Sequence, residues 1–323
     1  MLSTFKTTIN LVRAYLYDFA RYRKYSFISR QTSRGNRRAI IRIFIHYLEG
    51  GMCFPDVRLG YGQDKVKSVI KKLRTYNRDF GADETVAWAL STLTSYFDYH
   101  RERDHDLSAL EREFEDVSRE IALNDVDCSG GSELVTAKQI RAAAMVNFQQ
   151  FIQNRHSIRQ YAEGSLEPDT IRRIVQNAQH CPSVCNRQTC KVYALTDQQD
   201  VQIALNYQAG NAGFRQEIQT LFVVTANISE MNLIGERYQG WIDGGIFAMT
   251  LALSIHAEGL GACFLNWSTE PGQDRALRKC LGILDDELVI TMMSAGHLKP
   301  EFRVPVSRPK SLDEVLVLNP PLA

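Results

Sequence analysis

Two short stretches decide the fold of this chain: residues 155–159 read RHSIR, and residues 178–196 read AQHCPSVCNRQTCKVYALT. The first places two arginines and a hydroxyl close together, and guanidinium groups with a neutral donor suit the oxygens of a phosphate. The second runs from a helix end through a proline turn with side-chain amides into a strand, and such amides can read the edge of a flat heterocycle. Together the stretches indicate a phosphorylated cofactor. For the first stretch alone, a charged loop with incidental ion pairs is the alternative.

Helices and short strands alternate from about residue 137 onward, as in a layered α+β or α/β domain. Pro168 suits the first turn of a helix whose buried stripe begins at Ile171 and Ile174. The helix over 238–258 is apolar on nearly all faces, which predicts burial in a core or a subunit contact. The expected helices cover 140–154, 168–179, 199–209, 238–258 and 272–281, and the expected strands cover 191–195, 220–226, 262–267 and 288–294.

The first 145 residues read as mainly helical. Apolar residues recur at three- and four-residue spacing over 66–73, 86–97 and 107–123, and each stripe predicts an amphipathic helix. The glycines at positions 50, 51, 60 and 62 predict a structural turn rather than a phosphate loop, because no Gly-Lys-Ser/Thr follows them. Residues 124–132 (NDVDCSGGS) are interpreted as a linker.

The composition is that of a globular protein, with 44% hydrophobic and 23% charged residues among 323, and the net charge of +1 excludes a strong overall field. The first 48 residues nevertheless hold ten Lys/Arg and one acidic residue, Asp18. Nucleic acid, anionic lipid or an acidic polysaccharide could bind such a stretch, but a solvated helix face packed through its aromatic side is the preferred interpretation. Nucleic acid is therefore not an expected partner.

Cysteine usage and hydropathy favour a cytoplasmic protein. Seven cysteines, an odd number, suit reduced thiols better than a disulfide framework. The chain has no run of about 18 apolar residues and no secretory start, so we expect no membrane span. Cys181, Cys185 and Cys190 lack the spacing of zinc or iron–sulfur ligands, and we predict no metal site.

Taken in order, the two opening stretches resemble the nitroreductase family of flavin mononucleotide (FMN) enzymes. The family pattern is Arg-Arg/His-Ser-x-Arg, followed by Ala-Pro-Ser-x-x-Asn-x-Gln-Pro-Trp before a strand, and residues 155–159 and 181–190 supply its two halves. Residues 243–261 (DGGIFAMTLALSIHAEGLG) are similar to the family's long central helix and Gly-Leu-Gly, and residues 294–316 resemble its usual ending. The resemblance implies an α+β fold over 146–323, a mixed sheet flanked by helices, preceded by a mainly helical domain of unknown role over 1–145.

The resemblance also implies an FMN site. Arg155, His156 and Ser157 would hold the phosphate and ribityl chain together with Arg308, and Arg159 would lie by the N1 and C2 carbonyl edge of the ring, where a cation stabilises the reduced anion. Two further groups complete the expected site. Pro182, Ser183, Asn186 and Gln188 would come from the same subunit or from across a dimer interface, and Asn211, Leu265 and Asn266 would face the polar rim of the ring.

Several positions depart from the family pattern. Cys181 stands where alanine is usual, Thr189 and Cys190 replace Pro-Trp, and His297 follows Gly296 where an aromatic residue and proline are common. None of these changes removes a phosphate ligand. They alter the shape of the pocket, and therefore the choice of substrate.

The functional hypothesis is an NAD(P)H-dependent FMN oxidoreductase, a homodimer that passes hydride from NADH or NADPH through bound flavin to an aromatic, quinone or nitro acceptor by a ping-pong mechanism. No side chain is assigned as a catalytic acid or base. Two alternatives stay open. One is a pathway-specific flavin enzyme of surface-polysaccharide or secondary-product biosynthesis, in which the N-terminal helices shape the substrate site. The other is a non-enzymatic flavin-binding sensor or scaffold whose basic region binds an anionic partner.

Overall fold

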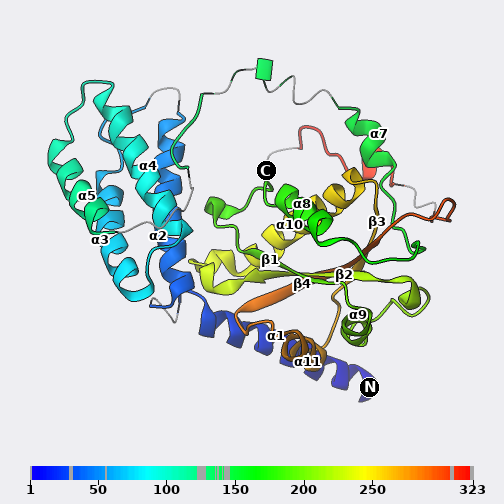
Figure 1. The fold of residues 1–323 in the computed structure, drawn as a ribbon. Coiled ribbons are helices and arrows are strands. Elements are labelled where there is room, and N and C mark those ends of the chain that lie inside the picture. The colour runs from blue at the N-terminus through cyan, green and yellow to red at the C-terminus, as the bar shows by residue number, and fades with distance from the viewer. Residues whose placement is uncertain are drawn as a thin grey trace.

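The computed structural model describes residues 2–28, 32–54, 57–121, 129–134, 136, 138–139, 141, 146–305 and 309–320. A group of helices comes first and a sheet with helices on both faces follows (Figure 1). The predicted linker over 124–132 is described only at residues 129–132, which form no helix or strand. Its residues 124–128 lie outside the described part of the chain.

In the described residues up to Ile121 the chain forms the helices α1 (Leu2–Tyr25), α2 (Arg34–Met52), α3 (Gln63–Phe80), α4 (Glu84–Arg101) and α5 (Ser108–Glu120). The helices predicted from the stripes at 66–73, 86–97 and 107–123 are confirmed as α3, α4 and α5. Asp83 caps α4, because its carboxylate accepts hydrogen bonds from the backbone N–H groups of Thr85 and Val86 at 2.9 and 3.3 Å.

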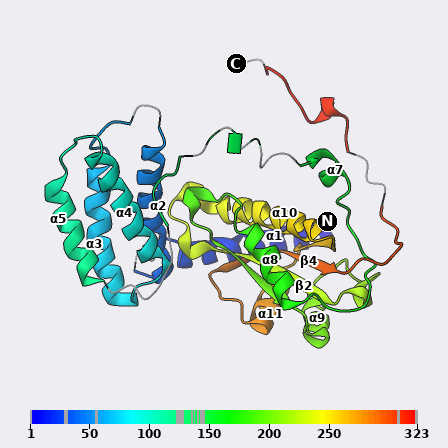
Figure 2. The same ribbon diagram turned by 45° about the horizontal axis from the view of Figure 1, so that its top comes forward.

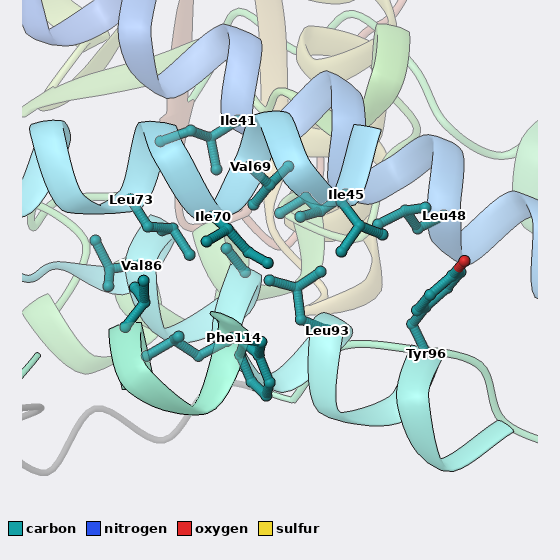
Figure 3. Packing of buried hydrophobic residues seen from close by; sticks show 14 of the residues in the cluster. Ile41, Ile45, Leu48, Val69, Ile70, Leu73, Val86, Leu93, Tyr96 and Phe114 are labelled. Atoms are coloured by element: carbon teal, nitrogen blue, oxygen red, sulfur yellow. The ribbon is translucent and has the colours of Figure 1, made fainter. Parts of the chain in front are cut away.

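Helices α2 to α5 pack around one apolar core, drawn in Figure 3. Ile45 of α2, Val69 and Leu73 of α3, and Leu93 of α4 are fully buried there, and Phe114 of α5 closes the cluster. Burial of one such side chain stabilises the fold by about 1.5–3 kcal/mol. The four-helix group therefore has a core independent of the sheet.

The glycine-rich segment differs in part from the prediction. Gly50 and Gly51 lie in the last turn of α2 rather than in a turn between helices. A Cβ at Gly51 would meet the Tyr61 ring at 2.1 Å, so this glycine allows the ring to pack directly against the backbone of α2. No local sequence pattern predicts that contact. Gly60 and Gly62 do form the expected turn, with φ of 73° and 68°.

The sheet has four strands in the order β1-β2-β4-β3, all antiparallel. The α+β fold is confirmed, and the only parallel pairing among the described residues is the single bridge between Ser157 and Ala262. The four predicted strands are confirmed with small shifts at their ends. They are β1 (Cys190–Leu195), β2 (Thr220–Asn227), β3 (Gly261–Asn266) and β4 (Glu287–Gly296).

Helices cover both faces of this sheet, as Figure 2 shows. On one face α8 and α10 pack on Phe222 and Met293 through residues such as Leu251, and on the other α9 and α11 pack on Val223 and Met292. Of the helix predicted over 140–154, only the second half is described in full, as α7; residues 140 and 142–145 lie outside the described residues. The helices are α7 (Phe148–Gln153), α8 (Pro168–Ala178), α9 (Gln198–Leu205), α10 (Gln239–Ala257) and α11 (Pro271–Leu281). The described residues also contain short 3-10 turns: η1 (Val184–Asn186), η2 (Arg215–Glu217), η3 (Ile228–Glu230), η4 (Ile234–Tyr238) and, after the last strand, η5 (Leu312–Glu314).

Helix α1 lies beneath the sheet beside α11, away from the core of α2 to α5 (Figure 1). The Tyr17 hydroxyl donates to Asp274 of α11 at 2.7 Å. Arg21 is 8% exposed and donates to the carbonyl oxygens of Asp285 and Glu287 at 3.1 and 2.6 Å. The first helix is thus joined to the sheet by hydrogen bonds, and the domain boundary near residue 145 stays a prediction.

The arginines of α2 are paired with carboxylates of α3, α4 and the turn between them. The pairs are Arg34–Asp83 at 3.0 Å, Arg37–Asp79, Arg38–Glu84 at 2.8 Å and Arg42–Glu84 at 2.9 Å. This pairing favours the structural interpretation of the basic stretch. Within the described residues, every helix is too short or too polar to cross a membrane.

Candidate functional site

The stretch 155–159 runs beside strand β3. The Ile158 N–H donates to the Ala262 carbonyl at 2.9 Å, and Ser157 forms a parallel bridge with the same residue. Ile158 is 6% exposed and packs in the core, whereas Arg155 and Ser157 are half-buried and Arg159 is exposed. An extended backbone here is what Arg155 and Ser157 require in order to share one face.

Positive charge is concentrated next to this stretch. Burial raises the pKa of the Cys263 thiol, while Arg159, Arg155 and a hydrogen bond with Ser157 act in the opposite direction. Neither arginine forms an ion pair with a carboxylate of the described residues; Arg159 contacts the Ser157 carbonyl at 3.3 Å and lies 5.8 Å from the centroid of the Phe214 ring. Two guanidinium groups without an acidic partner, beside a hydroxyl, form a donor set that fits a phosphate. His156 is half-buried next to them.

The other end of β3 carries a polar rim built from amides. The Gln208 side chain donates to the carbonyl oxygen of Asn266 at 3.0 Å, and the Asn211 amide donates to the Gln208 carbonyl at 2.6 Å. Asn211 and Leu265 are each 3% exposed, whereas the Asn266 side chain is exposed. Gln208 is a residue that the sequence prediction missed, because only the folded chain brings it to Asn266. Ala262 and Asn266 are four residues apart, so the arginine stretch and the amide rim lie about 13 Å apart along one strand.

The amide-rich turn 182–188 has an unusual backbone. Cys185, Asn186 and Gln188 have φ of 49°, 47° and 52°, the left-handed region that non-glycine residues rarely adopt. The Gln188 side chain is exposed and donates to the Asn186 side-chain oxygen at 3.2 Å, and its N–H donates to the Ser183 hydroxyl at 2.9 Å. Pro182 is exposed as well. The turn therefore presents two adjacent amides at its surface.

Arg187, between the two amides, was not predicted as a site residue. It is completely buried and forms a two-bond ion pair with Glu236 at 2.7 and 3.0 Å. It also donates to the carbonyl oxygens of Val184 and Glu230 at 3.2 and 2.5 Å. An arginine in a polar turn is normally exposed, so nothing in the sequence signals this burial.

The structure does not bring the two halves of the predicted site together within one chain. The turn leads into β1 at Cys190, which is level with Ala226 and Leu288, whereas the arginine stretch adjoins β3 at Ala262, level with Ala295. Strands β1 and β3 are the opposite edges of the sheet, about 14 Å apart, and the seven residues from Leu288 to Ala295 add about 23 Å along the strands. One flavin cannot contact both halves in a single chain.

Other residues singled out in the sequence have structural partners. His46 is exposed and lies 3.8 Å from Glu49, and the His256 ring contacts the Phe151 carbonyl at 3.1 Å, which fastens α7 to α10. Burial raises the pKa of Cys190 to about 12, as expected for a thiol in a core. Arg308 lies outside the described residues. No group of three potential metal ligands occurs in the described part of the chain.

The fold is an α+β domain in which the arginine stretch and the amide rim both lie along β3, an edge strand of the sheet. Residues 152–212 match the family model described as the nitroreductase family. A protein of Archaeoglobus fulgidus with the predicted activity NADH dehydrogenase/NAD(P)H nitroreductase is 24% identical over 151 residues, which are 46% of this chain and 84% of that protein.

Solved structures are similar at lower identity. A predicted nitroreductase from Desulfovibrio desulfuricans in complex with FMN is 22% identical, with a TM-score of 0.47, covering 54% of this chain and 98% of that one. An FMN-dependent nitroreductase from Clostridium difficile is 21% identical, with a TM-score of 0.45, covering 53% and 98%.

Residues 152–212 thus resemble the nitroreductase family, and the sequence-based recognition of that resemblance is confirmed.

Proposed function

We propose that this protein binds FMN along strand β3 and uses it to transfer hydride from NADH or NADPH to an aromatic, quinone or nitro acceptor. Two features at opposite ends of β3 carry the proposal. At one end lie the guanidinium groups of Arg155 and Arg159, which pair with no carboxylate of the described residues, and at the other lies the amide rim of Gln208 and Asn266. The first end suits a phosphate and the second a heterocycle edge.

Each residue has a distinct task in this proposal. Arg155, His156 and Ser157 bind the phosphate and ribityl chain, together with Arg308 from the C-terminal segment. Arg159 supplies positive charge at the ring edge where negative charge develops on reduction. Bound FMN supplies hydride transfer in two half-reactions, first with the nicotinamide and then with the acceptor. The protein orients these reactants and excludes water, so no side-chain acid or base is assigned.

The complete site is proposed to form across a homodimer. The separation of the two halves supports this arrangement, since Pro182, Ser183, Asn186 and Gln188 could then contact the flavin that the partner holds. One face of α10 supports it as well: in the single chain, several large apolar side chains of that helix are solvent-exposed, which is unusual unless another surface covers them. They are Trp241, Ile242, Ile246 and Met249, with exposed fractions of 37% to 52%.

The pathway-specific alternative is favoured by one observation. A cavity of about 460 Å³ lies between α1 and the segment that follows β3, and it is lined by Tyr17, Trp241 and Trp267 among others. Its volume and aromatic walls suit a small organic ligand. Trp267 directly follows Asn266 of the amide rim, so a helix outside the family domain would shape the acceptor site. Slow turnover of simple nitroaromatics by a fully flavinated enzyme would support this alternative.

The experiment that tests the proposal begins with the purified protein, which should be yellow with a flavin spectrum. Replacing Arg155 and Ser157 together with alanine should strip the FMN and leave the oligomeric state unchanged. Anaerobic bleaching by NADH or by NADPH then identifies the donor. A colourless protein that takes up no added FMN contradicts the proposal, and retention of FMN by the double variant contradicts the phosphate assignment. Flavin binding without turnover of any acceptor would instead favour a sensor or scaffold.

A composite site can be tested by mixing subunits. A chain carrying R155A/S157A and a chain carrying N186A/Q188A each lack one half of the site. Co-expression should give mixed dimers in which one of the two sites is intact, so tight flavin binding is regained at half of the wild-type stoichiometry, whereas dimers of either variant alone bind FMN weakly. No regain in isolated mixed dimers would show that both halves must come from the same chain.

A further inference from the structure

The amide-rich turn holds a backbone shape that is unfavourable by itself. Three non-glycine residues within four positions, Cys185, Asn186 and Gln188, are left-handed. Each such residue costs about 1–2 kcal/mol, so contacts from outside the turn must hold it in place. The turn then presents the amides of Asn186 and Gln188 side by side.

Arg187 is the inward anchor of the turn. Its guanidinium binds Glu236 and the Glu230 carbonyl from beyond the turn, and the Val184 carbonyl from within it. The Val184 N–H in turn faces the Asp243 carboxylate of α10 at 3.3 Å. The Arg187 side chain is thus held by these acceptors, whereas its backbone carbonyl oxygen accepts a hydrogen bond from a different residue.

That partner is Arg42, which comes from α2 of the N-terminal helices. Its Nη1 donates to the Arg187 carbonyl at 2.6 Å, its Nη2 to Glu84 at 2.9 Å and its Nε to the Thr85 hydroxyl at 3.3 Å. Arg42 is only 6% exposed, so water cannot easily replace it. Since Glu84 and Thr85 begin α4, the guanidinium is fixed by the helical bundle before it reaches the turn.

A second contact joins the same two regions. The Asn36 side chain of α2 donates to the Ser229 carbonyl in η3, and a Cβ at the neighbouring Gly35 would meet the Ser229 hydroxyl at 2.1 Å. Glu230, which follows, is 6% exposed. The pKa of its carboxyl is raised, because burial outweighs the opposing effect of the charges on Arg42, Arg38 and Arg187. Helix α2 therefore packs both against η3 and against the turn 183–188.

We infer that Arg42 is a positioning residue for the flavin site, through which the N-terminal helices hold the turn 183–188 in the shape that presents Asn186 and Gln188. The inference rests on the proposed function and gives the N-terminal helices a task that the family domain alone does not supply. If the turn serves the partner's flavin, the bundle of one subunit positions a wall of the other subunit's site.

The first test compares FMN affinity in Arg42→Met and Arg38→Met. Arg38 is the matched control, because it lies one turn away on α2 and binds the same Glu84 oxygen, but makes no hydrogen bond to the turn. We expect Arg42→Met to weaken FMN binding by about 10- to 100-fold, the range for loss of a charged hydrogen bond, and Arg38→Met to change it by less than about twofold. Arg42→Lys should restore part of the affinity, since lysine keeps the charge but not the three-way fork. Equal losses in the two methionine variants would overturn the inference.

The second test asks whether Arg42 acts through the two amides. In an N186A/Q188A background the amides are absent, so Arg42→Met should have little further effect on FMN affinity. The same fold-loss in both backgrounds would mean that Arg42 affects the fold in general, and would refute a positioning role.

The third test needs no flavin. Hydrogen exchange in the flavin-free protein should accelerate in the amides of residues 186–188 in Arg42→Met and not in Arg38→Met, because these N–H groups are bonded within the turn only while it keeps its shape. Unchanged exchange would overturn the inference even if FMN binds. A wild-type protein that binds no FMN would instead contradict the proposed function, and the exchange result would still decide the role of Arg42.

Discussion

The ion pair between Arg187 and Glu236 makes the sharpest prediction about stability. The Arg187 side chain is 0% exposed and that of Glu236 is 14% exposed, so replacing Arg187 by methionine leaves a largely buried carboxylate without its cation. Breaking a buried pair from one side costs about 3–5 kcal/mol. Glu236 still accepts hydrogen bonds from the Asn232 and Leu233 N–H groups at 2.5 and 3.1 Å, which places the expected loss for Arg187→Met near the lower limit, about 3 kcal/mol.

Urea unfolding at pH 7, followed by tryptophan fluorescence, measures this loss. The double variant R187M/E236L removes both charges, and it should be less destabilised than the sum of the two single variants by about 2 kcal/mol or more. Arg119→Met, which removes an exposed contact with Glu115, is the control and should leave the unfolding midpoint unchanged. A loss below about 1 kcal/mol for Arg187→Met, or strict additivity in the double variant, would refute the reasoning.

Three further predictions concern packing, pH and assembly. Gly51→Ala should destabilise the protein by about 1–3 kcal/mol because its Cβ would overlap the Tyr61 ring, whereas Gly50→Ala, with open space around it, should be neutral or stabilising by up to about 1 kcal/mol; thermal unfolding compares them. Burial opposes ionisation of Glu236, but the hydrogen bonds from Arg187, Asn232 and Leu233 together with the Arg187 charge outweigh it and lower the pKa of Glu236. Its contribution to stability is therefore present above the ordinary glutamate pKa of about 4.3 and is lost as the pH falls further, so the stability difference between pH 6 and pH 3 should be smaller in a Glu236→Gln variant than in the wild type. Ile246→Glu, on the exposed face of α10, should yield a monomer with weakened FMN binding in sedimentation and titration experiments, and an unchanged dimer would exclude that face as the interface.

Local sequence patterns predicted the elements of the fold well. The stripes that begin at Val66 and Val86 became α3 and α4 because a single buried face recurs every 3.6 residues, and this periodicity is legible without any tertiary contact. The strands were equally visible as short apolar runs between turns. Glycines were harder to interpret: Gly51 looked like a turn residue, and only the Tyr61 ring packed against it explains why it lies in a helix.

The parts of the candidate site were visible in the sequence, but their arrangement was not. Arg155, Ser157 and Asn186 were identified from local chemistry and a family resemblance, and their assignment to the flavin stays a prediction. Gln208 and Arg187 carried no local signal, because an amide or a guanidinium acquires its role only from the partner that the fold places beside it.

The sequence by itself determined which candidate groups this chain carries, since an arginine pair beside a hydroxyl and a turn rich in amides are properties of neighbouring residues. Tertiary structure alone decided where the two lie. Antiparallel pairing put them on opposite edges of one sheet, because each strand holds a fixed register that no adjacent residue can alter. Tertiary structure also brought Arg42, 145 residues away in the sequence, to the carbonyl of Arg187, because a buried guanidinium needs acceptors for its N–H groups and the folded turn supplies one of them.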